Sequence, residues 1–423
     1  MNILSVINKA KNNRTLVNGT LFSAFSFANQ GISFVLLILL ASYISPSEYG
    51  KLSLFNTLVQ FLGYFVALST TGYMSISFFQ RERAYFYKDF SAISVITIVC
   101  TGIVLLLIFF FKNTIIRLTD LPEYFIWIAI GVSFCSVFLS LYLDFLRIQE
   151  KVGKYGLMSC SFAILNFGVS LYLVAGMKLG WIGRPIAQIV CTFLYATLAI
   201  SFFIQKGMFV KSFKWEDYKR IIYWSIPLIP HLAAVWLKQG GDRLIINYYH
   251  SPEDVGIFSF ALNMMSIIIM IGTAFNATNS VSIYKTLASS QLPIEKKKSL
   301  NKQIKEIGII YIVAYITVII LGVILVPILL EQYVSSIPYF LILSIAGLFQ
   351  CFYFLYCNFL FYYHKNKILM YITFGTAVLH LCLSFALTRF SLYFTTTIYS
   401  IIQILIYLLI KNKSQKLLKE TGL

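Results

Sequence analysis

The sequence predicts an all-α membrane protein in which about twelve helices form two bundles of six. Three observations predict this fold: the composition, the number and length of the apolar stretches, and a short motif that occurs twice. Hydrophobic residues make up 59% of the 423 residues and charged residues only 12%, and the mean hydropathy is +0.79. A soluble protein has too little interior to bury that much apolar surface, so a polytopic helical membrane protein is expected.

The apolar stretches are long enough to cross a bilayer, whose hydrocarbon core needs about 20 apolar helical residues. In chain order they lie at roughly 16–44, 52–78, 90–111, 124–146, 156–176, 180–204, 221–248, 256–283, 307–330, 336–362, 368–388 and 391–410. The connecting segments are short, and the longest are inner segments near 205–220 and 284–306. Because no soluble domain or large outer catalytic loop fits into them, the function is expected to be performed within the helical bundles.

The net charge of +18 follows the positive-inside pattern. If the N-terminus is cytoplasmic, most Lys and Arg residues fall in the two tails and in the inner connections, above all in Lys206–Arg220 and Lys285–Lys305. This distribution predicts a multi-pass protein of the cytoplasmic membrane with both termini in the cytoplasm. A nucleic-acid partner is not expected, because no basic globular domain is predicted that would bind one.

A short motif occurs twice, nearly half a chain length apart. It reads Tyr43-Ile-Ser-Pro-Ser-Glu-Tyr-Gly50 and again Tyr249-His-Ser-Pro-Glu-Asp-Val-Gly256. A repeat at this spacing predicts two homologous bundles related by an axis along the membrane normal, with a substrate path between them. The expected organisation is a cytoplasmic tail at 1–15, a first bundle at 16–205, a basic linker at 206–220, a second bundle at 221–410 and a basic tail at 411–423.

The stretch 221–248 contains the most unusual charged residues, because a charge at the centre of a membrane helix costs about 2.5–3.5 kcal/mol. It holds Lys238, Asp242 and Arg243, and the first two lie four residues apart on one helix face. One interpretation is a neutralised structural pair beside an Arg243 that reaches the outer interface. The other is a hydrated cavity in which cations face an anionic substrate. The clustering of three charges favours the cavity.

Other polar residues in the apolar stretches each have two interpretations. Arg184 either reaches the outer interface or faces the cavity from the first bundle. Asp144 and Arg147 form either a local ion pair or, through Asp144, a proton site. His231 and His380 lie within apolar stretches. Since His titrates near neutral pH, proton coupling is the alternative there to a packing role.

The sequence contains no catalytic or metal-binding motif. There is no GxSxG, no Walker motif, no His/Cys metal spacing and no Gly-rich dinucleotide turn. The seven cysteines all lie in apolar stretches, where helix packing explains them. We therefore expect a transporter without its own ATPase, and neither an enzyme nor a cofactor-binding protein.

Two segments together resemble a known family. Ile44-Ser-Pro-Ser-Glu-Tyr-Gly50 is similar to the motif that follows the first helix of polysaccharide flippases of the multidrug/oligosaccharidyl-lipid/polysaccharide exporter superfamily. Ser225-Ile-Pro-Leu-Ile-Pro230, which continues to Trp236, Asp242-Arg243, Asn247 and Val255-Gly256, is similar to the same family. The O-antigen flippases are the branch that the chain resembles most, and the resemblance covers the whole chain.

The resemblance implies a V-shaped pair of six-helix bundles around a cationic cavity. Its implied substrate is an undecaprenyl pyrophosphate that carries one O-antigen repeat unit, moved from the inner to the outer leaflet. Lys238, Arg243 and Arg184 are the residues expected near the pyrophosphate, and Asp242, His231 and Asp144 are the candidates for coupling or charge pairing. A polysaccharide polymerase and a chain-length regulator are the implied partners, beside membrane lipids.

Three alternatives remain. A multidrug exporter of the same superfamily would bind organic cations, which a cavity lined by Lys and Arg disfavours. A membrane glycosyltransferase or polymerase would need a catalytic loop, and no outer connection is long enough. Flippases of the same branch for capsule, teichuronic acid or exopolysaccharide units fit the sequence as well as an O-antigen flippase does.

Overall fold

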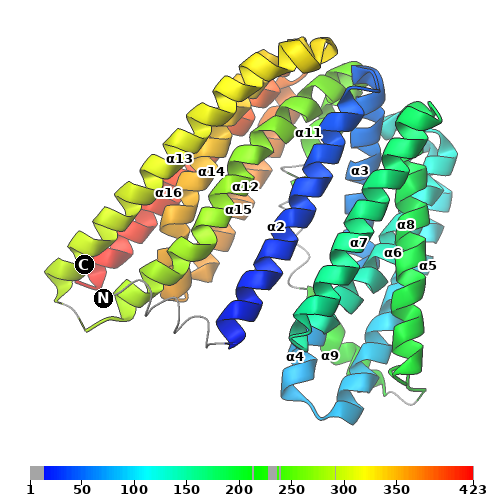
Figure 1. Ribbon diagram of the computed structural model, residues 1–423, viewed down its shortest axis with the longest axis horizontal. Helices are drawn as coiled ribbons and strands as arrows, with labels where there is room; N and C mark the ends of the chain where they lie inside the picture. The colour runs from blue at the N-terminus through cyan, green and yellow to red at the C-terminus, as the bar shows by residue number, and fades with distance from the viewer. Residues whose placement is uncertain (1–13, 212–213, 227–235, 238–239, 291, 423) are drawn as a thin grey trace. The chain divides into compact units, whose positions relative to one another are not determined.

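The structure is a computed structural model in which residues 14–422 are described, apart from 212–213, 227–235, 238–239 and 291. Every regular element among these residues is a helix (Figure 1). The chain divides into two compact units, Met1–Ile44 with Leu54–Leu232 (unit 1) and Ser45–Ser53 with Ala233–Leu423 (unit 2). The boundary between Leu232 and Ala233 lies after the linker expected at 206–220. Unit 2 also includes Ser45–Ser53, which contains the first turns of the helix that begins at Pro46.

In its described residues, unit 1 consists of six long helices that run side by side and two short ones, α4 and α9 (Figure 1). They are α2 (Arg14–Ala41), most of α3 (Pro46–Ala67), α4 (Thr71–Gln80), α5 (Arg83–Thr119), α6 (Glu123–Ile148), α7 (Val152–Leu171), α8 (Gly183–Gln205) and α9 (Trp215–Ser225). Helix α6 packs along α8, α2 packs along α7, and α7 also contacts both α6 and α8. Between α7 and α8 the chain forms a π-turn at Tyr172–Gly176 and a short 3-10 turn at Gly180–Ile182. These contacts bring α2, α6, α7 and α8 together around the polar cavity described below.

Unit 2 is organised around α14. Its helices are α11 (Gly241–Tyr249), α12 (Pro252–Ala288), α13 (Pro293–Leu329), α14 (Ile337–Tyr362), α15 (Asn366–Leu387) and α16 (Leu392–Glu420), with a 3-10 turn at Glu331–Ser336. Helix α14 contacts both α12 and α16 along much of its length. Near one end of the unit, Phe260 stacks on Tyr333 with ring centroids 4.4 Å apart. Tyr49, from the start of α3, packs edge-on against the same two rings.

The predicted fold class is confirmed. In the described part of the chain, eleven helical segments are long and apolar enough to cross a membrane, by length and composition. They correspond to eleven of the twelve apolar stretches expected from the sequence. The remaining stretch, 221–248, contains residues 227–235 and 238–239, which lie outside the described residues.

Several helices are longer than their apolar stretches. Helices α5, α12 and α13 have 37 residues each. The inner segment expected at 284–306 is largely helical, because α12 continues to Ala288 and α13 begins at Pro293. Its Lys, Glu, Gln and Leu residues favour helix, and a proline suits the first helical position. Apolar patterning locates the membrane-spanning part of a helix, whereas capping and helix propensity decide where the helix ends.

Candidate functional site

The two copies of the repeated motif have the same local structure at the starts of α3 and α12. The Ser45 backbone N–H donates to Glu48 Oε2 over 3.0 Å, and the Glu48 N–H donates to Ser45 Oγ over 3.3 Å. Ser251 and Asp254 form the same reciprocal pair, with both distances 3.2 Å. Such a capping box satisfies backbone donors that a helix start otherwise leaves unpaired. The similarity of the two sequences therefore reflects two helix starts of one kind.

These two helix starts cross at a pair of glycines within unit 2. A Cβ atom on Gly50 would lie 1.8 Å from the Pro252 carbonyl oxygen, and one on Gly256 would lie 1.8 Å from the Pro46 carbonyl oxygen. Because no side chain fits in that space, glycine is required at both positions for the backbones to approach this closely. The crossing places polar side chains of α3 beside those of α12.

Asp242 and His380 form a buried pair in unit 2. Asp242 lies in the first turn of α11, and His380 lies on α15. His380 Nε2 is 2.9 Å from Asp242 Oδ2 and 3.0 Å from Oδ1, and both residues are fully buried. The ring of Tyr399, on α16, packs edge-on against the imidazole with centroids 5.6 Å apart. A carboxylate and an imidazole held together away from water can share or exchange a proton.

Arg243, the residue after Asp242, joins this pair to the glycine crossing. Its Nε donates to Ser259 Oγ on α12 over 3.1 Å. The same Ser259 oxygen accepts a hydrogen bond of 2.7 Å from Ser53 Oγ on α3. Helices α3, α11, α12, α15 and α16 thus contribute to one continuous group of polar side chains. Lys238 and His231, the other candidates expected in this part of the chain, lie outside the described residues.

Arg184 lies at the start of α8 and lines a cavity of about 270 Å³ inside unit 1. Its Nη1 donates to the Asn166 side-chain oxygen and, over 2.8 Å, to Ser170 Oγ. Helices α2, α6, α7 and α8 form the walls, and no Asp or Glu lines them. Besides Arg184, the polar lining includes Asn29, Ser33, Ser136, Ser159, Asn166 and Gln188.

Several polar atoms of this cavity are buried without a hydrogen-bond partner among the described residues. They are Asn29 Oδ1, Gln188 Oε1 and Arg184 Nε. A buried polar atom without a partner costs roughly 1–3 kcal/mol, so such atoms are typical of sites that a ligand or water occupies. The cavity offers hydroxyls, amides and one cation to a ligand that is itself polar and anionic.

Asp144 stands apart from both groups. It forms an ion pair with Arg147 one turn further along α6, as one of its two interpretations predicted. Asp144 does not line the Arg184 cavity, whose α6 wall is formed by Ser136, Leu139 and Leu143. The described residues include no group of three or more His, Cys, Asp or Glu side chains that could hold a metal ion.

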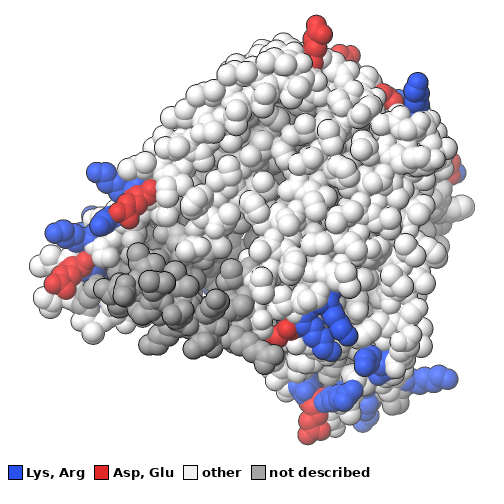
Figure 2. All heavy atoms as spheres, viewed as in Figure 1, with Lys and Arg blue, Asp and Glu red and all other residues white. Residues whose placement is uncertain are grey.

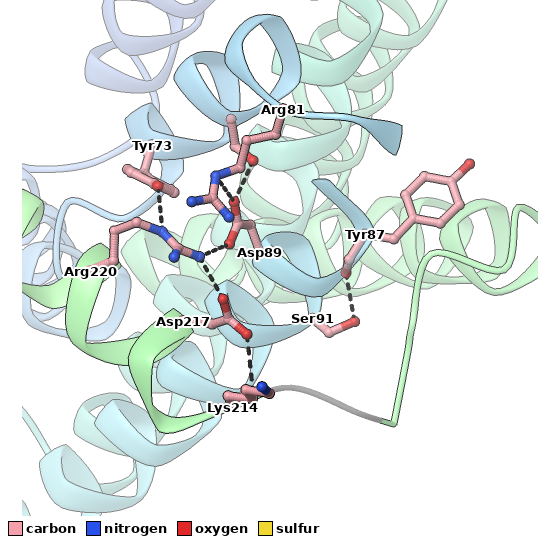
Figure 3. A network of polar contacts seen from close by, with 9 residues as sticks. Tyr73, Arg81, Tyr87, Asp89, Ser91, Lys214, Asp217 and Arg220 are labelled. Carbon is pink, nitrogen blue, oxygen red and sulfur yellow. Dashed lines mark hydrogen bonds and ion pairs between the residues drawn. The ribbon is translucent and has the colours of Figure 1, made fainter. Parts of the chain in front are cut away.

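Asp89 is a buried carboxylate that the sequence analysis did not identify. It is fully buried near the start of α5 and accepts hydrogen bonds from Ser77 Oγ at 2.6 Å and Arg220 Nη2 at 2.7 Å (Figure 3). Arg81 Nε lies 3.5 Å from it. The signal in the sequence was a lone Asp at the edge of an apolar stretch, with Arg81 eight positions before it.

Arg220 connects this network to helix α9. Its Nη2 also binds Asp217 Oδ1 over 2.6 Å, and its Nε donates to the Tyr73 hydroxyl over 3.0 Å (Figure 3). Burial raises the pKa of the Asp217 carboxyl, but the hydrogen bonds from Arg220 and the Lys214 backbone outweigh this, so the pKa lies below its ordinary value. Burial lowers the pKa of Arg220, and its bonds to Asp217 and Asp89 more than reverse that effect. The network holds α9 against α4 and α5.

Comparison with known proteins places this arrangement in a family. The profile of the family described as "Polysaccharide biosynthesis protein" matches residues 16–282. A protein of the Lsg locus of Haemophilus influenzae is 24% identical over 368 residues, which cover 84% of this chain and 87% of that protein. A membrane protein of the same organism is 21% identical over 341 residues, covering 79% and 81%.

Solved structures share the fold. The inward-facing conformation of a multidrug resistance MATE family transporter of the MOP superfamily has a TM-score of 0.70 at 11% identity, covering 92% of this chain and 95% of its own. A MATE transporter of Vibrio cholerae has a TM-score of 0.59 at 14% identity, covering 96% and 98%. At such low identities the similarity to solved structures shows the fold alone. The family is shown by the profile match, which extends over more than half of the chain. The chain therefore belongs to the polysaccharide biosynthesis protein family and shares the fold of MATE transporters.

Proposed function

We propose that this protein moves a lipid-linked oligosaccharide, an undecaprenyl pyrophosphate that carries one O-antigen repeat unit, from the inner to the outer leaflet of the cytoplasmic membrane. The observation that carries the proposal is the Arg184 cavity. It is a polar cavity without carboxylates inside an apolar helical unit of a chain from a polysaccharide biosynthesis family. Related units of capsule or exopolysaccharide are the alternative cargo.

The chemistry of such a cargo explains why a polar cavity is needed. A sugar head group has many hydroxyls, each of which would lose its hydrogen bonds in hydrocarbon at a cost of several kcal/mol. Asn29 and Gln188 each have a buried side-chain oxygen without a partner among the residues that the structure describes, and such oxygens accept hydrogen bonds from hydroxyls. The prenyl tail can stay in lipid while the head group passes.

The anionic part of the cargo fits the cation of the cavity. A guanidinium binds phosphate oxygens with paired hydrogen bonds. The guanidinium of Arg184 is positioned by its hydrogen bonds to Asn166 and Ser170. Lys238 and Arg243 remain proposed contacts of the pyrophosphate in unit 2. An inside-negative potential favours the outward movement of an anion by about 2.3 kcal/mol per charge per 100 mV.

Asp242 is the proposed coupling residue. Its buried pairing with His380 combines the two side chains whose protonation a transport cycle could alternate. Asp144 is the weaker candidate because Arg147 already compensates its charge. In the proposed cycle, protonation of the pair biases the alternating access of the two bundles, as transporters with internal repeats achieve by rocking. Both termini are proposed to be cytoplasmic, and a polysaccharide polymerase would use the flipped unit.

The proposal is tested in a deletion strain complemented with variants of the gene. Surface polysaccharide is read on gels, and lipid-linked repeat units are quantified. Deletion should abolish the polymer and accumulate a single lipid-linked unit. Arg184→Gln should reproduce this at normal protein level, and Arg184→Lys should restore part of the polymer. Lys112→Gln, which removes a cation from a pair with Glu123 at the end of α5, is the matched control. Normal polysaccharide in the deletion strain would refute the proposal and favour export of another small molecule.

A further inference from the structure

A second pocket of unit 1, of about 440 Å³, lies at the end of the unit that the positive-inside pattern predicts to be cytoplasmic. It lies where the α4–α5 connection, the α6–α7 connection and the end of α8 meet. Figure 2 shows Lys and Arg side chains gathered at the end of unit 1 where α4 and α9 lie in Figure 1. This pocket is separate from the Arg184 cavity, since the two share no lining residue.

The pocket is strongly cationic. Arg81, Arg83, Lys151 and Lys206 line it, and no Asp or Glu does. Arg81 is partly compensated by Asp89 at 3.5 Å, whereas the other three form no ion pair with a carboxylate among the described residues. Like charges that converge on one space repel each other, so their convergence favours an anionic occupant.

Two buried aromatic rings line the pocket. Phe86 and Phe145 are buried and stack with an interplanar angle of 7° at 6.1 Å. Arg83 Nε donates to the Tyr87 hydroxyl over 2.8 Å. A guanidinium can bind a phosphate with two parallel hydrogen bonds, and Lys151 and Lys206, which are exposed as Arg83 is, add flexible point charges. Figure 3 shows two of the lining residues, Arg81 and Tyr87.

Gln149 adds a requirement for a hydrogen-bond donor. Its Oε1 is buried without a hydrogen-bond partner in the part of the chain that the structure describes, and the residue lines the pocket. A phosphate alone cannot satisfy an acceptor, whereas a hydroxyl close to the phosphate can. A positive-inside signal needs only charges in an inner connection, and it explains neither this unsatisfied oxygen nor the two buried aromatic rings.

We propose that this pocket binds the phosphate headgroup of a lipid whose headgroup also carries hydroxyls. Two lipids share that chemistry: a prenyl diphosphate sugar and phosphatidylglycerol. In both lipids the phosphate lies at the membrane surface, within reach of Arg83, Lys151 and Lys206. A hydroxyl of the same headgroup then donates to Gln149 Oε1. The prenyl diphosphate sugar would make the pocket a loading site for the proposed cargo, and phosphatidylglycerol would make it a site for a structural or regulatory lipid.

The test uses the purified full-length protein in detergent, with two soluble probes: geranyl diphosphate glucose and dihexanoyl phosphatidylglycerol. Dihexanoyl phosphatidylcholine is the neutral reference. Calorimetric titration should show that at least one anionic probe binds, more tightly than the reference and less tightly as salt increases. Arg83→Gln with Lys206→Gln should weaken that binding about tenfold or more. Lys112→Gln with Arg117→Gln, which removes the same charge from the other end of α5, should leave it unchanged.

Two further variants keep the test decisive. Gln149→Leu removes the acceptor without changing charge and should weaken binding of the same probe. Arg83→Lys with Lys206→Arg keeps the net charge and should bind the probe more tightly than the doubly neutral variant does, because the attraction between the cations and the phosphate is retained. Tighter binding of the glucose probe identifies the cargo as the source, and tighter binding of phosphatidylglycerol identifies the membrane lipid.

Absence of binding by both anionic probes, or binding that none of the pocket variants weakens, would overturn the proposal. The measurement involves no transport, so its outcome is separate from that of the proposed flippase function. If the protein flips its cargo normally but binds neither probe, the proposed headgroup binding is disproved and the proposed flippase function is not affected. A protein that binds phosphatidylglycerol through these residues while its deletion leaves surface polysaccharide intact would disprove only the flippase.

Discussion

Ser53 and Ser259 each lie three residues after the glycine that ends one copy of the repeated motif, 206 residues apart, and Ser53 Oγ donates a hydrogen bond of 2.7 Å to Ser259 Oγ. Gly50 and Gly256, one turn earlier in each copy, meet at the helix crossing in the same reciprocal way. Equivalent residues of the repeat thus contact each other rather than unrelated partners. The crossing is locally symmetric, which explains why both copies keep a glycine and a serine at these positions.

The glycine crossing predicts a sharp size limit. Gly256→Ala should lower the free energy of unfolding by about 1–3 kcal/mol or more, because its Cβ would overlap the Pro46 carbonyl and force the backbones apart. Gly63→Ala in α3 is the control, because a Cβ atom added there would have no heavy atom within 4 Å outside its own stretch of helix. This variant should be neutral or more stable, since Ala favours helix. Thermal unfolding of the detergent-solubilised protein measures both. Equal melting temperatures for the two variants would contradict the crossing.

The buried pair of α11 and α15 predicts strong coupling between two residues that are 138 positions apart. His380→Leu should destabilise the protein by about 3–5 kcal/mol, because it leaves the Asp242 carboxylate buried without its partner. The double variant Asp242→Asn with His380→Leu should regain part of that loss, since an amide is less costly to bury than a carboxylate. Urea or thermal unfolding of the two single variants and the double variant completes the cycle. Strictly additive effects would show that the residues do not interact.

The Arg184 cavity predicts that stability and transport respond in opposite directions. Gln188→Leu removes a buried oxygen that has no partner in the described part of the chain, so the melting temperature should stay the same or rise. Export of lipid-linked repeat units should nevertheless fall, because the cavity loses an acceptor for sugar hydroxyls. Ile189→Leu, on the same turn of α8 but absent from the cavity lining, is the control and should leave export unchanged. If Gln188→Leu exports normally at normal protein level, the cavity does not hold the cargo.

The Asp217–Arg220 pair predicts a pH-dependent contribution to stability. The pKa of Asp217 in the folded protein lies below its ordinary value of 3.8. Its contribution is therefore fully present above that value and is lost as the pH falls through the folded pKa. Asp217→Asn should lower the melting temperature at neutral pH, and the difference from the wild type should shrink as the pH falls below about 4. Glu216→Gln, the exposed neighbour, is the control. A difference that stays constant with pH would contradict the ion pair.

The sequence predicted much of the fold and part of the candidate sites. Apolar stretches identified the membrane helices because burial in lipid requires a continuous apolar surface, a property that each segment carries by itself. Lys238 and His231 remain candidates, as they lie outside the described residues. Asp242 was identified as unusual because a carboxylate in an apolar stretch is costly. The partner of Asp242 was not identified, because the nearby Lys238 was the partner that the sequence suggested. His380 approaches Asp242 from a helix far along the chain.

Asp89 and Gln149 show the same limit at the predicted cytoplasmic end. Each lies at the edge of an apolar stretch, where polar residues are ordinary and attract no attention in a sequence. Their significance comes from burial and from side chains of other helices, such as Arg220 beside Asp89 and Phe86 in the pocket that Gln149 lines.

The sequence by itself determined the membrane class, the approximate spans, the family and the repeated helix start, because composition and capping act within a few neighbouring residues. The orientation that the charge distribution indicates stays a prediction. Only the tertiary structure decided that the two repeats meet at Gly50 and Gly256, that Asp242 is paired with His380, and that Arg184 lines a cavity. These facts depend on which helix faces pack together. Helix packing sums many weak contacts between residues far apart in the chain, and no single segment contains that information.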